Sequence, residues 1–293
     1  MGGGSWTEKD YTSYSCSVGR SVTKGATGAM CFMADDYSAQ DVYKSRHLQP
    51  ELNPHNVTRE CCDSEEHPNT IPVILALDVT GSMGSTAVEV ASKLNEVMTE
   101  LYKSITDVEF CIMGIGDLAW DAAPIQISQF ESDIRIAEQL DKIYFEGGGG
   151  GNRYESYTAA WYMGLNHTKL DCWKRGKKGI IITMGDEPLN PYLPADRLAR
   201  VTGDTLQADV ETKDLYKQVV EKFDVYHIAV DGGYSNCYKR YASDVESTYK
   251  EFLDDNHFFV ANLNSIAGMI VNILTNAPNG DVAVVADNTE ISW

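Results

Sequence analysis

The stretch 71–84, IPVILALDVTGSMG, constrains the fold most, because a run of aliphatic residues ends there abruptly in a carboxylate and several hydroxyls. Residues 73–77 form a short run of apolar, mostly branched side chains, a pattern that predicts a fully buried strand. Asp78, Thr80 and Ser82 follow at alternate positions, and the glycines among and after them allow the chain to turn sharply into a helix. The sequence therefore predicts a strand, a polar turn and a helix in immediate succession.

This turn carries one carboxylate and two hydroxyls, from Asp78, Thr80 and Ser82. Hard oxygen ligands of this kind suit a small divalent cation such as Mg²⁺, which keeps some of its water molecules in protein sites. A simpler interpretation is that the Asp and Ser side chains only cap the following helix. The residues of the turn alone do not decide between a metal site and a helix cap.

Strand and helix patterns alternate through most of residues 71–275, which predicts an α/β fold: a doubly wound, mostly parallel central sheet with helices on both faces. Buried strands are predicted at 73–77, 108–115, 124–130, 180–184, 223–230 and 257–261. Helices are predicted near 88–105, 134–143, 157–165, 215–220, 238–253 and 266–274.

The chain divides into three parts. Residues 1–70 are polar, rich in Tyr, Ser and Gly, and without a sustained period, so they predict an irregular N-terminal arm. Residues 71–276 form the α/β domain, and residues 277–293 form a polar C-terminal tail. The aromatic residues of the arm indicate that it lies on a surface, either that of its own domain or that of a neighbouring subunit.

Acidic residues recur where predicted strands end. Asp117, Asp186 and Asp231 each follow a strand as Asp78 does, and Glu155 precedes a helix on the same edge of the sheet. Ligands of open parallel sheets bind outside the carboxyl ends of the strands. Crowded carboxylates are also costly without a cation, which favours the metal site over the helix cap. Asp117 and Asp231 could equally be surface acids, an interpretation that is favoured for Asp231, and Asp186 has a β-turn as its alternative.

The segment LDVTGSM resembles the metal-ion-dependent adhesion site of von Willebrand factor A domains, whose signature is Asp-x-Ser/Thr-x-Ser. Together with QFESD, EGGGGGNRYES, RGKKG and MGDEP it is similar to stand-alone bacterial and phage-encoded proteins of that family. The resemblance implies a metal held by Asp78, Thr80 and Ser82, with Asp186 acting through water. It also implies a protein partner whose own Asp or Glu completes the metal shell.

The sequence departs from this family in the loop that normally supplies a Thr ligand. Five glycines at 147–151 occupy that loop, and Glu155 stands where the Thr is expected. The resemblance therefore implies Glu155 as the fifth ligand, with Ser156 as an alternative and Asn152 as a weaker one. Ser156, Asn152 and Asp117 are otherwise expected to surround the site without binding the metal directly.

Three functions are compatible with these residues. The first is a non-catalytic binding or assembly module that uses Mg²⁺, or alternatively Mn²⁺ or Ca²⁺. The second is an enzyme, because DVTGS also resembles the Asp-Lys-Thr-Gly-Thr phosphoacceptor of haloacid dehalogenase-like ion pumps; Asp78 would then be the nucleophile and Asp186 a metal ligand. Val79 replaces the Lys of that motif, which favours the binding module. The third is a structural component of a larger assembly, for example a viral one.

The net charge and the cysteines indicate which partners and which cellular compartment to expect. A net charge of −19 argues against nucleic acid or an anionic membrane as the main partner. No run approaches the roughly 18 apolar residues of a membrane span, and the first residues lack a signal-sequence pattern. Seven scattered cysteines without zinc-ligand spacing predict free thiols. We therefore expect a cytoplasmic protein, or one within a virion or phage assembly, with self-association through the arm as a further option.

Overall fold

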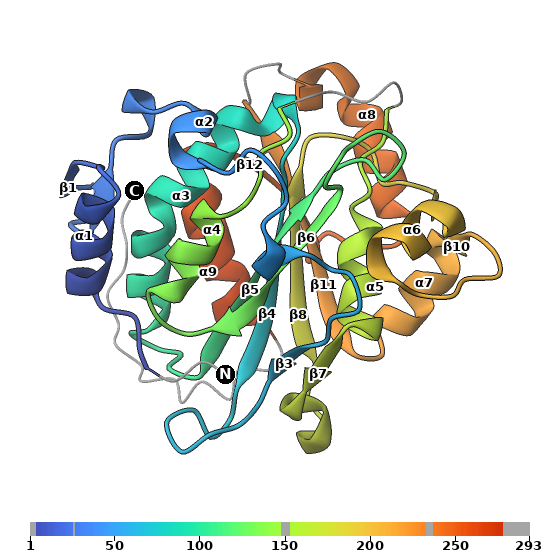
Figure 1. Ribbon diagram of the computed structural model, residues 1–293, viewed down its shortest axis with the longest axis horizontal. Coiled ribbons are helices and arrows are strands. Elements are labelled where there is room, and N and C mark those ends of the chain that lie inside the picture. The colour runs from blue at the N-terminus through green and yellow to red at the C-terminus, as the bar shows by residue number, and fades with distance from the viewer. Residues whose placement is uncertain (1–3, 26, 148–152, 233–236, 278–293) are drawn as a thin grey trace.

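The computed structural model describes residues 4–25, 27–147, 153–232 and 237–277. At its centre lies a six-stranded sheet, which Figure 1 shows with helices on either side. Its strands are β4 (Ile71–Asp78), β5 (Val108–Ile115), β6 (Ile125–Glu131), β8 (Gly179–Gly185), β11 (Phe223–Asp231) and β12 (Phe258–Asn262). All six strands coincide with predicted strands to within two residues at either end.

The strand order is β12-β11-β8-β4-β5-β6, and every neighbouring pair is parallel except β5 with β6. The chain builds β4, β5 and β6 toward one side and then crosses to β8 on the other side of β4. The direction of winding therefore reverses between β4 and β8, which confirms the predicted doubly wound α/β fold. A reversal of this kind opens a crevice at the carboxyl ends of the two strands.

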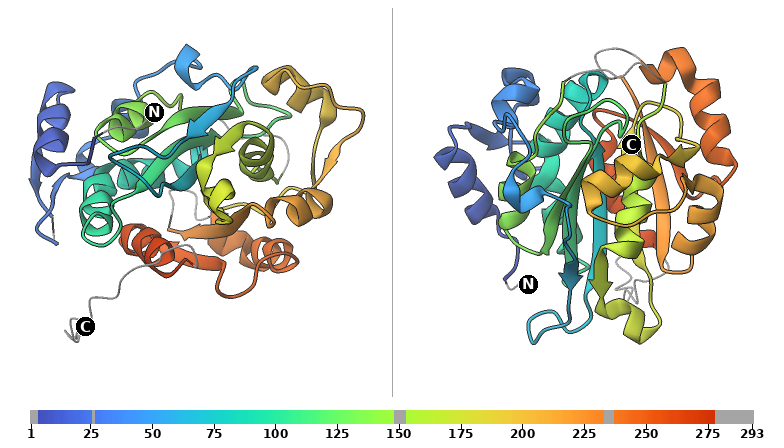
Figure 2. Two further views of the ribbon diagram at one scale, coloured as in Figure 1. Left: turned by 90° about the horizontal axis from the view of Figure 1, so that it is seen from below. Right: turned by 45° about the vertical axis from the view of Figure 1, so that its right-hand side comes forward.

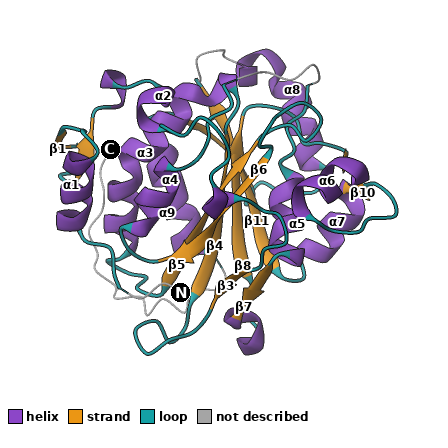
Figure 3. Ribbon diagram, in the orientation of Figure 1, coloured by secondary structure: helices purple, strands orange, loops and turns teal. Residues whose placement is uncertain are grey.

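One face of the sheet is covered by α3 (Gly84–Leu101), α4 (Arg135–Asp141) and α9 (Ile266–Asn276). Buried apolar residues recur every three or four positions along α3, as predicted for a helix with one apolar stripe. This stripe packs on Val73, Leu75 and Leu77, the side chains that alternate to this face of β4. Figure 3 shows these helices on one side of the strands.

The opposite face is covered by a second group of helices, which packs on Ile74 and Ala76 of β4. This group comprises α5 (Thr158–Asn166), α6 (Ala195–Thr202), α7 (Thr212–Val219) and α8 (Cys237–Lys250). Helix α6 was not predicted, because Pro191 and Pro194 made its surroundings look irregular. Pro194 in fact directly precedes the helix, a position where its missing N–H leaves no bond unmade.

Residues 4–25 and 27–62 lie on the domain and contain more regular structure than their sequence pattern indicates. They include α1 (Glu8–Ser17), the hairpin of β1 (Val22–Lys24) and β2 (Met30–Phe32), α2 (Ala39–Val42) and β3 (Arg59–Cys61). Both views of Figure 2 place α1 outside α3, away from the sheet. Trp6, Tyr11 and Tyr43 of this arm are buried in the core on that side.

The remaining strands are short and lie at the periphery. β3 pairs in parallel with β7 (Thr168–Leu170), and β9 (Tyr192–Leu193) pairs with β10 (Val210–Glu211). Of the predicted C-terminal tail, residues 278–293 lie outside the described part of the chain. Within the part that the structure does describe, no helix combines the length and apolar character needed to cross a membrane.

Candidate metal centre

Two of the predicted site residues lie at the carboxyl ends of β4 and β8, the strands between which the direction of winding reverses. Asp78 is the last residue of β4, and Asp186 directly follows β8, the strand paired with β4. Both side chains are almost fully buried, with 1% of each residue exposed. The crevice between the two strands therefore has a carboxylate on each side.

Hydrogen bonds connect Asp78, Thr80, Ser82 and Asp186. Thr80 Oγ1 donates to Asp78 Oδ1 at 2.6 Å, and the Thr80 backbone N–H donates to the same oxygen at 2.8 Å. Ser82 Oγ donates to Asp186 Oδ1 at 2.9 Å and lies 3.5 Å from Thr80 Oγ1. A hydroxyl that gives its proton to a carboxylate keeps its lone pairs for another group. Thr80 and Ser82 are therefore set to present oxygen lone pairs.

Tyr157 supplies a further contact that sequence reasoning missed, because it predicted only a buried apolar role for this residue. Its hydroxyl donates to Asp78 Oδ2 at 2.7 Å, so both carboxylate oxygens of Asp78 accept hydrogen bonds. The approach needs Gly185: a Cβ on that residue would lie 2.0 Å from the Tyr157 hydroxyl oxygen. The glycine that ends β8 thus makes room for the tyrosine that orients Asp78.

Glu155 lies beside this group. Its backbone bridges to Leu189, three residues beyond Asp186, and only 3% of the residue is exposed. Its Oε2 atom is buried without a hydrogen-bond partner in the described part of the chain. The glycine run begins close by, where the Gly147 N–H donates to Val79 O at 3.4 Å.

The other predicted residues have different roles or no described position. Ser156 Oγ accepts from the Leu118 N–H at 3.0 Å, which fastens the loop after β5 to the start of α5. Asp117 Oδ1 accepts from the Ala119 N–H at 2.7 Å within that loop. Asn152 lies outside the described residues. Asp231, interpreted as a surface acid, lies 3.5 Å from Lys239.

The electrostatics of this edge are those of crowded carboxylates. Burial, and then the neighbouring Asp186, raise the pKa of Asp78 above its ordinary value. Burial and the Asp78 carboxylate raise the pKa of Glu155 strongly. Burial, with Asp78 and Asp186, raises the pKa of Glu187 to about 7. Burial and neighbouring acids are thus the main causes of all three shifts, and they disfavour the charged forms of these carboxyl groups.

The donor set fits a small hard cation. Its oxygens come from Asp78, Thr80, Ser82 and Asp186, with the orphaned Glu155 Oε2 nearby, and such oxygens are the ligands that Mg²⁺ prefers. No cluster of three or more His, Cys, Asp or Glu side chains in the described residues is placed to hold a metal. Asp78, Asp186 and Glu155 are therefore not gathered as three direct ligands in the described structure, and hydroxyls contribute half of the four linked side chains.

The same contacts bear on Asp78 as a nucleophile. A nucleophilic carboxylate needs an oxygen that can approach a substrate, as in covalent catalysis by Asp. In this structure Asp78 Oδ1 accepts two hydrogen bonds from Thr80 and Oδ2 accepts one from Tyr157. These bonds orient the Asp78 carboxylate, and by themselves they do not separate a nucleophile from a metal ligand.

No protein-family model and no curated protein matches the sequence. Among solved structures, the chain is similar to the pilus adhesin SpaC from Lactobacillus rhamnosus GG, with 11% identity, a TM-score of 0.44 and 74% of this chain covered. It is also similar to the vWF domain of the type V pili tip protein Mfa5 from Porphyromonas gingivalis, with 14% identity, a TM-score of 0.41, and coverage of 70% of this chain and 94% of that one.

A third similar structure is proximal thread matrix protein 1 from the mussel byssus, with 12% identity and a TM-score of 0.43. The match covers 70% of this chain and 47% of that protein. For SpaC, the matched region spans 31% of the adhesin. At identities of this size, the function has to be argued from the geometry of the site itself.

Proposed function

We propose that this chain is a divalent-metal-dependent module that binds or assembles with a protein partner, and that a partner carboxylate completes the metal shell. The observation that carries the proposal is the hydrogen-bonded set of Asp78, Thr80, Ser82 and Asp186 at the reversal point of the sheet. A cation there would favour the charged forms of these carboxyl groups, whose pKa values are raised by burial and by one another.

The proposed metal is Mg²⁺, with Mn²⁺ or Ca²⁺ as alternatives, since all three take oxygen ligands. Asp78, Thr80 and Ser82 would hold it directly, and Asp186 would act on its water molecules. Glu155 is the proposed ligand from the glycine loop. If Glu155 binds, the centre carries an extra negative charge and depends less on an incoming acid.

A metal at this edge would supply binding chemistry, because it could attract a carboxylate from a partner. The chain's own residues keep that position rigid, since Tyr157 fixes Asp78 and Ser82 fixes Asp186. We also propose that the protein works in the cytoplasm or within a phage or virus assembly. The six cysteines that the structure describes form no disulfides, which suits a reducing compartment.

Calorimetric titration with Mg²⁺ and Mn²⁺ tests the metal site. We expect binding to the parent protein and loss of binding in Asp78→Asn, which keeps the shape of the side chain but removes its charge. Asp231→Asn is the matched control, because Asp231 also ends a strand of this sheet but pairs with Lys239. Equal heats for the parent and Asp78→Asn would refute the metal site.

Two further comparisons test the ligand set and the partner. Glu155→Gln should weaken Mg²⁺ binding more than Glu187→Gln if Glu155 is the loop ligand. Affinity capture from the native cell should then yield a partner that is lost with a chelator and with Asp78→Asn. A partner that is retained under both conditions would fit a structural component of an assembly instead.

A further inference from the structure

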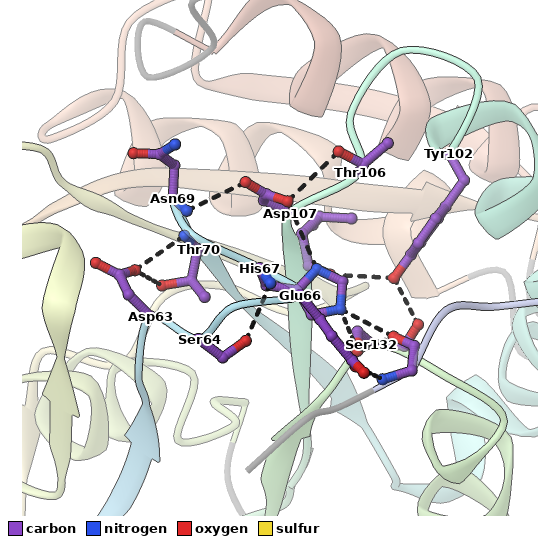
Figure 4. Close-up of polar contacts among 12 residues, drawn as sticks. Asp63, Ser64, Glu66, His67, Asn69, Thr70, Tyr102, Thr106, Asp107 and Ser132 are labelled. Atoms are coloured by element: carbon purple, nitrogen blue, oxygen red, sulfur yellow. Dashed lines mark hydrogen bonds and ion pairs between the residues drawn. The ribbon is translucent and has the colours of Figure 1, made fainter.

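A second group of polar side chains lies at the opposite edge of the sheet from the candidate metal centre. His67 precedes β4, Asp107 precedes β5, and Ser132 follows the antiparallel strand β6, so all three lie at the amino-terminal edge of the parallel strands. Figure 4 shows the His67 ring between Asp107 and Ser132. His67 and Ser132 are 2% and 0% exposed, respectively.

The side chains of His67 and Ser132, together with that of Glu66, bind the backbone of one residue, Gly4. The Gly4 carbonyl oxygen lies 2.8 Å from Ser132 Oγ and 2.9 Å from His67 Nε2. The Gly4 N–H donates to Glu66 Oε2 at 2.7 Å. Both polar groups of this glycine are therefore bound by side chains more than 60 residues away in the sequence.

A carbonyl oxygen can only accept hydrogen bonds, so both neighbours must donate to it. The Ser132 hydroxyl gives its proton to Gly4 O, and His67 carries a proton on Nε2, which also lies 3.2 Å from Ser132 Oγ. The other ring nitrogen, Nδ1, faces Asp107 Oδ1 at 3.5 Å. These two donors bind the carbonyl oxygen in its ground state at 2.8 and 2.9 Å, and they would also face a negative charge that developed on that oxygen.

The donors are fixed by contacts that do not involve Gly4. The Tyr102 hydroxyl donates to the Ser132 carbonyl oxygen at 2.5 Å. The backbone N–H of His67 donates to Ser64 Oγ at 3.0 Å, and the backbone N–H of Asn69 donates to Asp107 Oδ2 at 3.1 Å. The pair of donors is thus preorganised, which is the condition under which such a pair lowers a reaction barrier.

The bond that follows this carbonyl joins Gly4 to Ser5 and is held on both sides. Gly4 has a φ of +102°, which favours glycine, and a Cβ there would lie 3.0 Å from Asp133 Oδ2. On the other side, the buried Trp6 donates from Nε1 to Asn95 Oδ1 at 2.8 Å. Ser5 between them is exposed to solvent. Its hydroxyl is close to the Gly4 carbonyl carbon by covalent geometry, since attack on that carbon closes a five-membered ring.

We propose that the Gly4–Ser5 bond is a self-processing site, at which the Ser5 hydroxyl attacks the Gly4 carbonyl carbon and the Ser132 and His67 donors stabilise the oxyanion. The Ser5 Oγ–carbon bond forms and the hydroxyl proton passes to solvent. The carbon–nitrogen bond then breaks, and the Ser5 nitrogen takes a proton from solvent, which leaves an ester. Water hydrolyses this ester to a Gly4 carboxylate and a chain that begins at Ser5 with a free amine.

Intact-mass measurement of the full chain, incubated at neutral pH with and without hydroxylamine, tests this proposal. We expect a product lighter by the residues before Ser5, formed faster with hydroxylamine, which cleaves the ester and leaves a hydroxamate on Gly4. Ser5→Ala removes the nucleophile from an exposed position and should abolish the product. Ser5→Cys should release the same fragment through a thioester that hydroxylamine cleaves faster.

The two donors are tested by separate variants. Ser132→Ala and His67→Phe should each slow the release about 10²-fold, the usual effect of losing one oxyanion donor. Ser17→Ala is the matched control, because its hydroxyl bonds to Tyr14 O on the same arm and away from Gly4. Circular dichroism checks that each variant is folded. Full-length mass in both the parent and Ser5→Cys after hydroxylamine would overturn the proposal, and so would an unchanged rate in Ser5→Ala.

Discussion

At the scale of single residues, a buried hydroxyl joins the two halves of the candidate metal centre. Tyr157 belongs to the segment that enters α5, and its hydroxyl bonds to Asp78 at the end of β4. The Tyr249 hydroxyl is buried in the same aromatic group, 6.3 Å away between ring centroids, and has no hydrogen-bond partner in the described residues. The two tyrosines allow the contribution of the Tyr157–Asp78 hydrogen bond to stability to be measured, because the Tyr249 hydroxyl is equally buried but has no described hydrogen bond.

Tyr157→Phe should lower the free energy of unfolding by about 1.5–3 kcal/mol, the range for a hydrogen bond to a charged group. Tyr249→Phe removes a buried hydroxyl without breaking a described bond, so it should lower the free energy of unfolding much less than Tyr157→Phe does. Urea denaturation in the presence of a chelator measures both. Equal losses in the two variants would contradict the role assigned to the Tyr157 hydroxyl.

A second residue-scale prediction concerns acid sensitivity. His227 in β11 is fully buried, its ring stacks on Tyr249 with centroids 3.8 Å apart, and its Nδ1 lies 2.8 Å from Thr183 Oγ1. Burial lowers the pKa of His227 well below its ordinary value. The unfolded chain therefore takes up this proton near pH 6.5 while the folded chain does not. Stability from the neutral ring is complete above that pH and falls as the pH decreases further.

His227→Phe keeps an aromatic ring at this position but cannot be protonated, and Thr183 Oγ1 retains Tyr226 O at 3.2 Å. Between pH 7 and pH 5.5, the parent should lose about 1–2 kcal/mol relative to this variant. Shifted carboxylates such as Asp78 titrate in both proteins, so they cancel in the difference. Urea denaturation at each pH measures it, and a difference that does not change with pH would rule out His227 as the source.

At the scale of elements, helix α3 holds the arm on one side and the sheet on the other. The contact with the arm centres on Asn95, which is fully buried. Its Oδ1 accepts from Trp6 Nε1 at 2.8 Å, and its Nδ2 donates to Met30 O at 2.9 Å. A side chain in the middle of α3 thus ties together the start of the arm and the strand β2.

Asn95→Ala should loosen the arm, because it leaves the buried Trp6 N–H and the Met30 carbonyl without these partners, at about 1–3 kcal/mol for each. Hydrogen exchange followed by mass spectrometry should show faster exchange over residues 4–25 and 27–32, with β4 and β8 unchanged. Thr99→Ala is the control on the same helix, since it removes only a 3.4 Å contact to Asn95. Unchanged exchange in Asn95→Ala would show that apolar packing alone holds the arm.

The elements also show what the sequence can and cannot predict. Strands β4 and β5 were predicted closely because each is a short apolar run buried on both faces. Asp78 and Asp186 were expected to meet because parallel strands bring their carboxyl ends to one edge. The antiparallel direction of β6 and the presence of α6 were not predicted, since a strand pattern has no direction and Pro191 and Pro194 suggested an irregular segment.

The details of the site depend on distances that no local pattern contains. The Tyr157 hydroxyl reaches Asp78 because Gly185, 28 positions further along, leaves space for the ring. Gly4 is bound by Ser132 and His67 through contacts between distant loops. The acid Glu187, whose pKa burial raises to about 7, is adjacent to Asp186 and could have been found by asking which neighbours share that edge.

At the scale of the whole molecule, a net charge of −19 affects stability in two separable ways. Repulsion among surface carboxylates acts over the whole protein and is screened by any salt. The buried carboxylates at the reversal point of the sheet are screened much less, and a bound cation would offset them locally. General screening and specific binding should therefore differ in their dependence on the identity of the cation.

NaCl should raise the melting temperature of the parent and of Asp78→Asn alike, because it screens the same surface charge in both. Mg²⁺ at the same ionic strength should raise the melting temperature further in the parent alone. The corresponding gain in the free energy of unfolding is about 2.7 kcal/mol when the Mg²⁺ concentration is 100 times the dissociation constant. Excess chelator should remove that increment and leave the effect of NaCl. The comparison rests on Asp78→Asn: if this variant gains as much from Mg²⁺ as the parent does, the cation acts on the surface and the candidate centre does not bind it.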